Sequence, residues 1–184
     1  MLFTKKGPPG TEATLAVAVA RAEELKITNI VVASVTGETV KRLLPLVPDN
    51  INVTCVTHHA GFLKPGDQEM NKQVRDELAS AGVELLTTTH LLGGIDRAVE
   101  NTFGGSYPGG LVAHTLRMLG QGTKVAVEIA VMALDAGLIP YGEDIVAIGG
   151  TGRGADTAIV IRPEHAKNFF GGKIKEIICK PRDL

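Results

Sequence analysis

The sequence predicts an α/β fold of three layers with a mostly parallel sheet, and three observations lead to that prediction. Short apolar segments rich in Val and Ile alternate with helix-length segments, as in βαβ units. These apolar segments are continuous and not alternating, which is typical of strands covered on both faces. The chain has 184 residues and no linker or low-complexity segment. We therefore expect one α/β domain over residues 1–184.

The first half of the chain is expected to form three helix and strand repeats. A Pro-Pro-Gly sequence precedes the first helix, which Thr11 is expected to cap. Asp67 is the expected cap of the third helix, and Gly82 follows its end. The predicted helices span residues 11–26, 37–44 and 68–81, and the predicted strands span residues 27–35, 51–57 and 83–87.

The second half is more helical before it returns to the sheet. Residues 102–110 are rich in glycine and are expected to form a loop. Helices are predicted at residues 95–101, 111–119 and 123–136, and strands at residues 144–148, 157–161 and 174–179. The last strand is expected to close the sheet as an edge strand.

The helical excursion also predicts where a ligand binds. After three strands in one direction, the chain is expected to return beside the first strand, which gives a strand order near 3-2-1-4-5. In such a sheet the order reverses between the first and fourth strands, and ligands bind there at the carboxyl ends. The loops at that position are residues 34–39 and 149–154.

Composition excludes several classes of partner. The net charge is −1 and the basic residues are scattered, which argues against nucleic acid binding. The longest apolar stretch, residues 125–134, contains Glu128 and is too short to span a bilayer. Cys55 and Cys179 lie in apolar strand segments and are expected to be buried thiols. We therefore expect a soluble, cytoplasmic protein with no membrane or nucleic acid partner.

The first loop is suited to an anion. Ser34, Thr36, Gly37, Glu38 and Thr39 join a strand to a helix. The backbone N–H groups at a helix start lack helical partners, and the helix dipole favours negative charge there. Three hydroxyl groups in six residues exceed what one cap needs, although Thr36 as a simple cap is the alternative.

The second loop offers close backbone approach. Gly150, Thr151, Gly152, Arg153 and Gly154 form a glycine-rich segment between two strands. The segment fits neither the Walker pattern nor the dinucleotide fingerprint. Its backbone N–H groups can surround an anion, and Arg153 can bind a phosphate or carboxylate through two hydrogen bonds. The alternative is a flexible hairpin loop with a solvated Arg153.

Three further features bear on the site. His58 and His59 follow the second strand, so they are expected at the rim of the same crevice, where one of them can contact a ligand. His90 is the available third metal ligand, but we expect no metal site. Lys124 and Glu128 lie one turn apart in an apolar helix, either as a surface pair or lining the pocket or an interface.

The apolar character of residues 123–136 predicts that this helix is buried or meets another subunit. We therefore expect a homo-oligomer. Phe62, Phe103 and Tyr107 lie in predicted loops that can reach the crevice. No nucleophile–base arrangement and no pair of catalytic carboxylates is recognisable, so the catalytic residues are unknown.

Residues 11–57 and 143–161 resemble the C-terminal α/β domain of pyruvate kinase. In that domain a Thr/Ser-Gly loop after an early strand and a Thr-Gly-rich loop after a late strand hold a sugar-phosphate effector. A second resemblance covers nearly the whole chain, to a family of stand-alone, largely archaeal proteins of uncharacterised function. It is carried by the motifs at residues 31–39, 57–62, 120–128 and 149–157.

These resemblances imply a function that the residues alone do not. Pyruvate kinase activity is not expected, because the catalytic barrel of that enzyme is absent. The second family implies a flavin mononucleotide (FMN) ligand, with its phosphate in the loop of residues 34–39. The sequence leaves open an FMN-binding domain, a small FMN-dependent oxidoreductase with His58 or His59 and Lys124 tuning the ring, and a sugar-phosphate sensor. Whether the chain is an enzyme is undecided.

Overall fold

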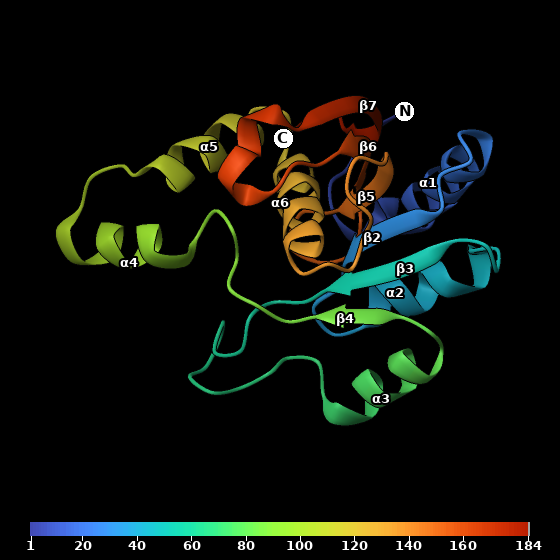
Figure 1. Cartoon of the computed structure of the whole chain (residues 1–184), viewed down its shortest axis with the longest axis horizontal. Helices are drawn as coiled ribbons and strands as arrows, with labels where there is room; N and C mark the ends of the chain where they lie inside the picture. Colours follow the sequence, from blue (N-terminus) through green and yellow to red (C-terminus); the bar gives the residue numbers. More distant parts are fainter. Residues whose placement is uncertain (184) are drawn as a thin grey trace.

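The structure, a computed structural model, describes residues 1–183 and contains a seven-stranded mixed sheet (Figure 1). The strands are β1 (Leu2–Phe3), β2 (Asn29–Ala33), β3 (Asn52–Val56), β4 (Glu84–Leu86), β5 (Ile145–Gly149), β6 (Thr157–Arg162) and β7 (Lys173–Pro181). Their order is β1-β7-β6-β5-β2-β3-β4. Strands β2, β3, β4 and β5 are parallel, and β6 is antiparallel to both β5 and β7.

This order confirms the predicted arrangement of the first five predicted strands, since 3-2-1-4-5 corresponds to β4-β3-β2-β5-β6. The prediction for the last strand was wrong in one respect. Strand β7 is not at the edge, because the short β1 pairs with it in parallel, with Leu2 opposite Lys180. Two residues of sequence carry too little periodicity to reveal a strand.

Helices cover both faces of the sheet and complete the three layers. The α-helices are α1 (Thr11–Glu24), α2 (Glu38–Leu43), α3 (Lys72–Ser80), α4 (Gly94–Phe103), α5 (Pro108–Arg117) and α6 (Gln121–Asp135), and the 3-10 helices are η1 (Pro8–Gly10), η2 (Leu44–Leu46) and η3 (Ala166–Gly171). Helices α1, α2 and α3 contribute to one apolar cluster, and α6 forms the other on the opposite face. Valine and isoleucine alternate between these clusters along β2, where Val31 faces α6 while Ile30 and Val32 face α1 and α2.

Two predicted helix caps were wrong. Thr11 already lies inside α1, and its hydroxyl oxygen accepts a hydrogen bond from the Ala155 N–H at 3.1 Å, so a tertiary contact uses the group. The α3 helix begins at Lys72, not near Asp67. Its cap is Asn71, whose side chain accepts from the Val74 N–H at 2.9 Å. The predicted loop at residues 102–110 is also shorter, since α4 extends to Phe103 and α5 begins at Pro108.

Helix α6 is covered within the chain. Its residues from Gly122 to Leu134 are buried with the exception of the half-buried Val125, and they pack on β2, β5 and β6. The close approach of α6 to the sheet requires a glycine on the helix and a glycine on the sheet. A Cβ at Gly122 would lie 2.1 Å from the Thr157 Oγ1, and one at Gly149 would lie 2.3 Å from the Gly122 carbonyl oxygen. The apolar surface of α6 therefore finds its partner in its own sheet.

Both cysteine thiols are free and buried, as predicted. Burial raises the pKa of Cys55 to about 12 and also raises the pKa of Cys179. Thiolate formation is thereby suppressed, and neither residue is suited to be a nucleophile. Among residues 1–183, none of the helices combines the length and the apolar character that crossing a membrane requires.

Candidate functional site

The carboxyl ends of the four parallel strands lie along one edge of the sheet (Figure 1). The backbone ladder continues one residue beyond two of these strands. The Ser34 N–H donates to the Val56 carbonyl at 3.1 Å, and the Thr57 N–H donates to the Leu86 carbonyl at 2.9 Å. The loops that begin at Ser34 and His58 therefore start side by side, at the usual strand spacing of about 4.8 Å.

The loop between β2 and α2 adopts a conformation that only glycine accommodates well. Gly37 has φ of 94°, and a Cβ there would lie 2.5 Å from the Cγ1 of Val74. Helix α2 then begins at Glu38 with no side-chain cap. Thr36 and Glu38 are exposed, while Ser34 and Thr39 are buried. The Thr36 hydroxyl is therefore not used as a cap, and the first N–H groups of α2 need partners outside the helix.

The glycine-rich loop follows β5, the neighbour of β2, where Val32 pairs with Ile148. It packs mainly against the N-terminal segment. Gly7 approaches Thr151 and Arg153, and its N–H donates to the buried Asp156 carboxylate at 2.8 Å. Arg153 is exposed to solvent. The structure thus brings the two predicted loops to adjacent strand ends, but the glycine-rich loop turns towards residues 7–11 and α6.

Beside this loop lies a cavity of about 200 Å³. Its lining residues are Lys6, Arg117, Gln121, Thr151 and Pro181. The Arg117 Nε donates to Gln121 Oε1 at 2.8 Å, which fixes the guanidinium at the start of α6. Two cationic side chains beside a glycine-rich loop make this cavity electrostatically suited to an anion.

Aromatic rings gather at the ends of β3 and β4. Phe62 stacks on His58 with ring centroids 3.8 Å apart. The His90 ring lies 5.5 Å from His58 and 5.1 Å from His59, centroid to centroid. The Glu69 Oε2 lies 2.7 Å from the His58 Nδ1 and orients that ring. The structure therefore brings His58 and His59 together with His90 and Phe62, and we call this group the histidine cluster.

Lys124 and Glu128 form a buried ion pair, with side-chain exposures of 11% and 6%. Of the two alternatives left open by the sequence, a surface pair is excluded, because α6 is enclosed between the sheet and the segment around Leu92. The second carboxylate oxygen of Glu128 accepts the Leu92 N–H at 2.8 Å. The pair therefore ties α6 to the chain just after His90, and it places Lys124 close enough to act on the His90 charge.

The electrostatics of the histidine cluster keep His90 neutral. The pKa of His90 is lowered to about 4, and burial is the largest cause. The Glu128 carboxylate raises this pKa, while the nearby His58, His59 and Lys124 add to the lowering. A neutral imidazole at neutral pH has one N–H donor and one acceptor nitrogen. His90 is thus able to hydrogen-bond a ligand in either sense without adding charge.

Within residues 1–183, no group of three or more His, Cys, Asp or Glu side chains has an arrangement suited to a metal ion. The three imidazoles instead contact one another through their rings.

A surface hollow of about 690 Å³ lies elsewhere, on α3. That hollow is lined by charged and polar side chains that pair with one another, such as Lys72 with Asp76 and Gln73 with Glu77. It has none of the anion-suited or aromatic groups found at the strand ends.

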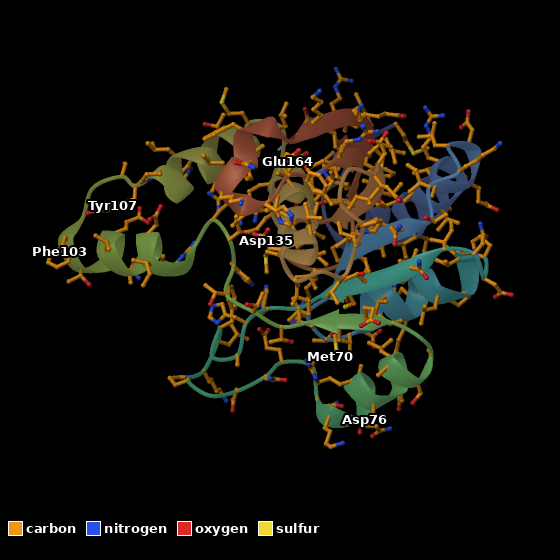
Figure 2. The ribbon with its side chains drawn as sticks, in the orientation of Figure 1. Met70, Asp76, Phe103, Tyr107, Asp135 and Glu164 are labelled. Carbon is orange, nitrogen blue, oxygen red and sulfur yellow. The ribbon has the colours of Figure 1, made fainter. Side chains whose placement is uncertain are left out.

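Sequence reasoning placed some residues wrongly and missed others. Phe103 is the last residue of α4 and Tyr107 directly precedes α5, and both lie well beyond the strand ends (Figure 2). Glu69 was missed because its segment was predicted to be helical. Asp156 is completely buried, and a signal was present, since a lone aspartate sits between two apolar strands.

Together, these features define a three-layer α/β domain with an anion-suited loop and an aromatic cluster at the carboxyl edge of its sheet. The family described as "Pyruvate kinase, alpha/beta domain" matches residues 12–161, and the chain belongs to that family. The fold therefore agrees with the resemblance stated from the sequence.

Solved pyruvate kinases from Cryptosporidium parvum are distant structural matches. One has 18% sequence identity and a TM-score of 0.42, covering 80% of this chain and 22% of that one. Another, in complex with ADP, has 18% identity and a TM-score of 0.43, covering 85% of this chain and 24% of that one. The chain spans less than a quarter of the length of these enzymes.

Proposed function

We propose that this chain binds a phosphorylated small molecule with a planar ring at the carboxyl edge of β2 and β3, and that the ligand is FMN. One observation carries the proposal. The loop from Ser34 to Thr39 follows β2, and the His58, His59 and Phe62 part of the histidine cluster follows the adjacent β3, where the Ser34 N–H donates to the Val56 carbonyl. A phosphate site and an aromatic surface therefore lie within the reach of one nucleotide-sized ligand.

The phosphate end is assigned to the first loop. The N–H groups of Gly37, Glu38 and Thr39 have no partners within α2, and the exposed Thr36 hydroxyl adds a further donor. Arg153, with Gly150, Thr151, Gly152 and Gly154, supplies a second set of donors at the neighbouring strand end. Both sets are suited to the phosphate or ribityl groups of FMN.

The ring end is assigned to the histidine cluster. The stacked pair of His58 and Phe62 presents flat surfaces, and stacking between aromatic rings contributes about 0.5–1.5 kcal/mol beyond burial. Lys124 lies in the same region, and because Glu128 balances its charge, the buried ion pair would act on a bound ring as a local dipole and not as a net positive charge. The choice of FMN among planar phosphates rests on the resemblance to the stand-alone family.

Two alternatives have specific support. If Lys124 and His58 or His59 tune the ring, the chain acts as a small FMN-dependent oxidoreductase, in which FMN supplies the redox chemistry. If the cavity beside Lys6 and Arg117 is part of the site, two separated anionic groups are preferred, as in a sugar bisphosphate, and the chain acts as a sensor.

The first experiment is an absorption spectrum of the purified protein, with mass spectrometry of any molecule released on denaturation. Bound FMN supports the proposal. A colourless protein that does not take up added FMN contradicts the ligand and favours the sugar-phosphate sensor, which binding of a sugar bisphosphate would test directly. Reduction of bound FMN by NADH or NADPH distinguishes the oxidoreductase from a binding domain.

The site is tested by titration of FMN fluorescence. A Thr36→Ala/Arg153→Ala variant is expected to bind FMN at least ~10-fold more weakly, since it loses hydrogen bonds to a charged group. Arg162→Ala is the matched control, because Arg162 pairs with Asp144 at the opposite edge of the sheet. Equal affinity of both variants for FMN would contradict the position of the site.

A further inference from the structure

Helix α4 and the exposed side of α5 form a projecting arm. Figure 1 shows α4 standing away from the sheet, while α5 packs beside α6. The arm is anchored at its base, where Leu92 bonds Glu128 and where Ala113 is buried. We use the name α4–α5 arm for residues 94–119.

The arm carries a concentration of exposed apolar side chains. It contains five of the fourteen large apolar residues that are exposed in the structure, although it is a short part of the chain. Ile95 is 78% exposed, Phe103 79% and Met118 77%, and Leu111 and Leu119 are also exposed. Scattered exposed apolar residues are normal, whereas a grouped set marks an interaction surface.

The apolar residues of α4 have the spacing of an amphipathic helix that packs on a neighbour. Ile95, Val99 and Phe103 follow each other at intervals of four residues and therefore lie along one side of the helix. Such a stripe normally packs on the body of its own chain. Here the main neighbour of α4 is α5, and the two ends of the stripe remain in solvent.

We propose that the α4–α5 arm is the contact surface of a homodimer, in which the arms of two copies pack on each other about a twofold axis. The area supports this occupant. At roughly 200 Å² for a whole large apolar side chain, the five exposed residues leave roughly 650 Å² per copy. Two copies would bury roughly 1,300 Å², which lies within the range of specific, stable interfaces. A surface that packs on its own equivalent satisfies closed twofold symmetry.

The charges on the arm favour a protein partner over a lipid surface. Its ionised residues are Asp96, Glu100, Arg97 and Arg117, so the two signs balance. Helices that lie on anionic membranes instead carry a polar face rich in Lys and Arg. The balanced charge also avoids repulsion between two identical arms. The homodimer is independent of the ligand proposal, since no arm residue is needed for the phosphate or the ring.

The test measures the molecular mass of the protein by analytical ultracentrifugation. The protein concentration runs from about 1 to about 100 µM, which covers roughly the dissociation constants expected of a dimer. The expected result for the unaltered protein is twice the 19.3 kDa protomer mass. An Ile95→Ser/Phe103→Ser variant is expected to weaken dimerisation at least ~30-fold, because buried aromatic residues are commonly interface hot spots. Leu25→Ser/Leu46→Ser is the matched control, which removes two exposed apolar residues before β2 and β3, and it should dimerise normally.

A second measurement keeps the apolar face intact. Since Cys55 and Cys179 are buried, an Asn101→Cys variant carries one accessible thiol, and a short bismaleimide should link two copies through α4. A Lys26→Cys control should give no linked dimer. The proposal is overturned if the unaltered protein is monomeric at 100 µM, or if the serine arm variant dimerises as well as the control. It is also overturned if the monomer instead floats with anionic lipid vesicles.

Discussion

Helices α6 and α4 are both rich in apolar residues, but only α6 has its apolar surface covered within the chain. Helix α6 lies between the sheet and α5, and nearly all its side chains are buried. Helix α4 has no fully buried residue and leaves both ends of its apolar stripe in solvent. An apolar helical segment therefore indicates that a partner exists, but not whether that partner is the same chain or another copy.

The difference follows from what surrounds each helix. Gly122 and Gly149 allow α6 to approach β5 and β6 closely, and the ion pair of Lys124 and Glu128 fixes its outer side. Helix α4 begins at Gly94, φ 46°, and is followed by Gly104 and Gly105 at positive φ. Its glycines occur at its ends, where they direct the chain away from the body.

The largest expected effect is on the buried ion pair. Glu128→Ala would leave the Lys124 ammonium without its partner and the Leu92 N–H without its acceptor. Removing one member of a buried pair costs about 3–5 kcal/mol, which corresponds to a fall in Tm of about 6–20 °C for a chain of this size. Thermal unfolding followed by circular dichroism measures it.

The control for that variant removes both charges. Lys124→Met/Glu128→Leu fills similar volume with apolar atoms and should lose much less stability than Glu128→Ala, because no uncompensated charge remains. A double variant as unstable as the single one would mean that the bond from Leu92 to Glu128, and not the charge balance, holds α6 to the segment after His90.

The second effect compares the close packing of α6 on the sheet with the looser packing of the α4–α5 arm. Gly122→Ala places a Cβ 2.1 Å from the Thr157 Oγ1 and should cost about 1–3 kcal/mol, because α6 must shift from β6. Gly110→Ala in α5 meets no atom within 4 Å and should be neutral or stabilising by up to about 1 kcal/mol. Chemical denaturation of the two variants compares them. Similar costs at both positions would contradict the packing difference between α6 and the arm.

The same contrast explains how much of the fold was predictable. Strand order followed from continuous apolar segments and from the long helical excursion, which both express burial on two faces. The role of Thr11 was not predictable from local sequence, because its hydroxyl accepts from the Ala155 N–H, which is distant in sequence. The α3 cap is instead a local interaction, in which Asn71 accepts from the Val74 N–H. Asn and Asp are both common N-cap residues, so residue type alone did not separate Asn71 from Asp67.

The proximity of the three histidines was predictable, because strand ends determine it. His58 and His59 come directly after β3 and His90 follows β4, so parallel pairing alone brings them near one another. The position of Lys124 was not predictable, because its burial depends on how the segment after β4 crosses α6. Side chains that meet through loop geometry, such as Glu69 with His58, leave no pattern in the sequence.

The third effect is the response of the histidine cluster to acid. The pKa of His90 is lowered to about 4 in the folded chain, so between pH 6.5 and 4 the unfolded chain binds more protons at this residue. The free energy of unfolding is therefore independent of His90 protonation above pH 6.5. It decreases as the pH falls towards 4, by up to about 1.4 kcal/mol per pH unit. His90→Gln should flatten the pH dependence of Tm in that window.

The matched control is His114→Gln, because His114 is exposed on α5. Comparison of the two variants shows how much of the change in the Tm profile comes from removing an exposed histidine rather than the buried one. The groups that act on His90 are His58, His59, Lys124 and Glu128. Nuclear magnetic resonance titration of the His90 ring distinguishes their contributions, since Glu128→Gln should lower its pKa and Lys124→Met should raise it. A His90 ring that titrates near 6.5 in the unaltered protein would contradict its burial.

The smallest effect is expected on the arm, and it completes the comparison. Ile95→Ser should change the stability of the monomer by less than about 0.5 kcal/mol, since the side chain is 78% exposed and loses few contacts. The same change in α6, Ile129→Ser, removes a 4% exposed side chain from the core and should cost about 3 kcal/mol or more. Unfolding measured at protein concentrations too low for dimerisation reports the stability of the monomer alone, without the contribution of the dimer contact. If Ile95→Ser destabilised the monomer as strongly as Ile129→Ser, the arm would have to fold back on its own chain, and its apolar surface would then need no second copy.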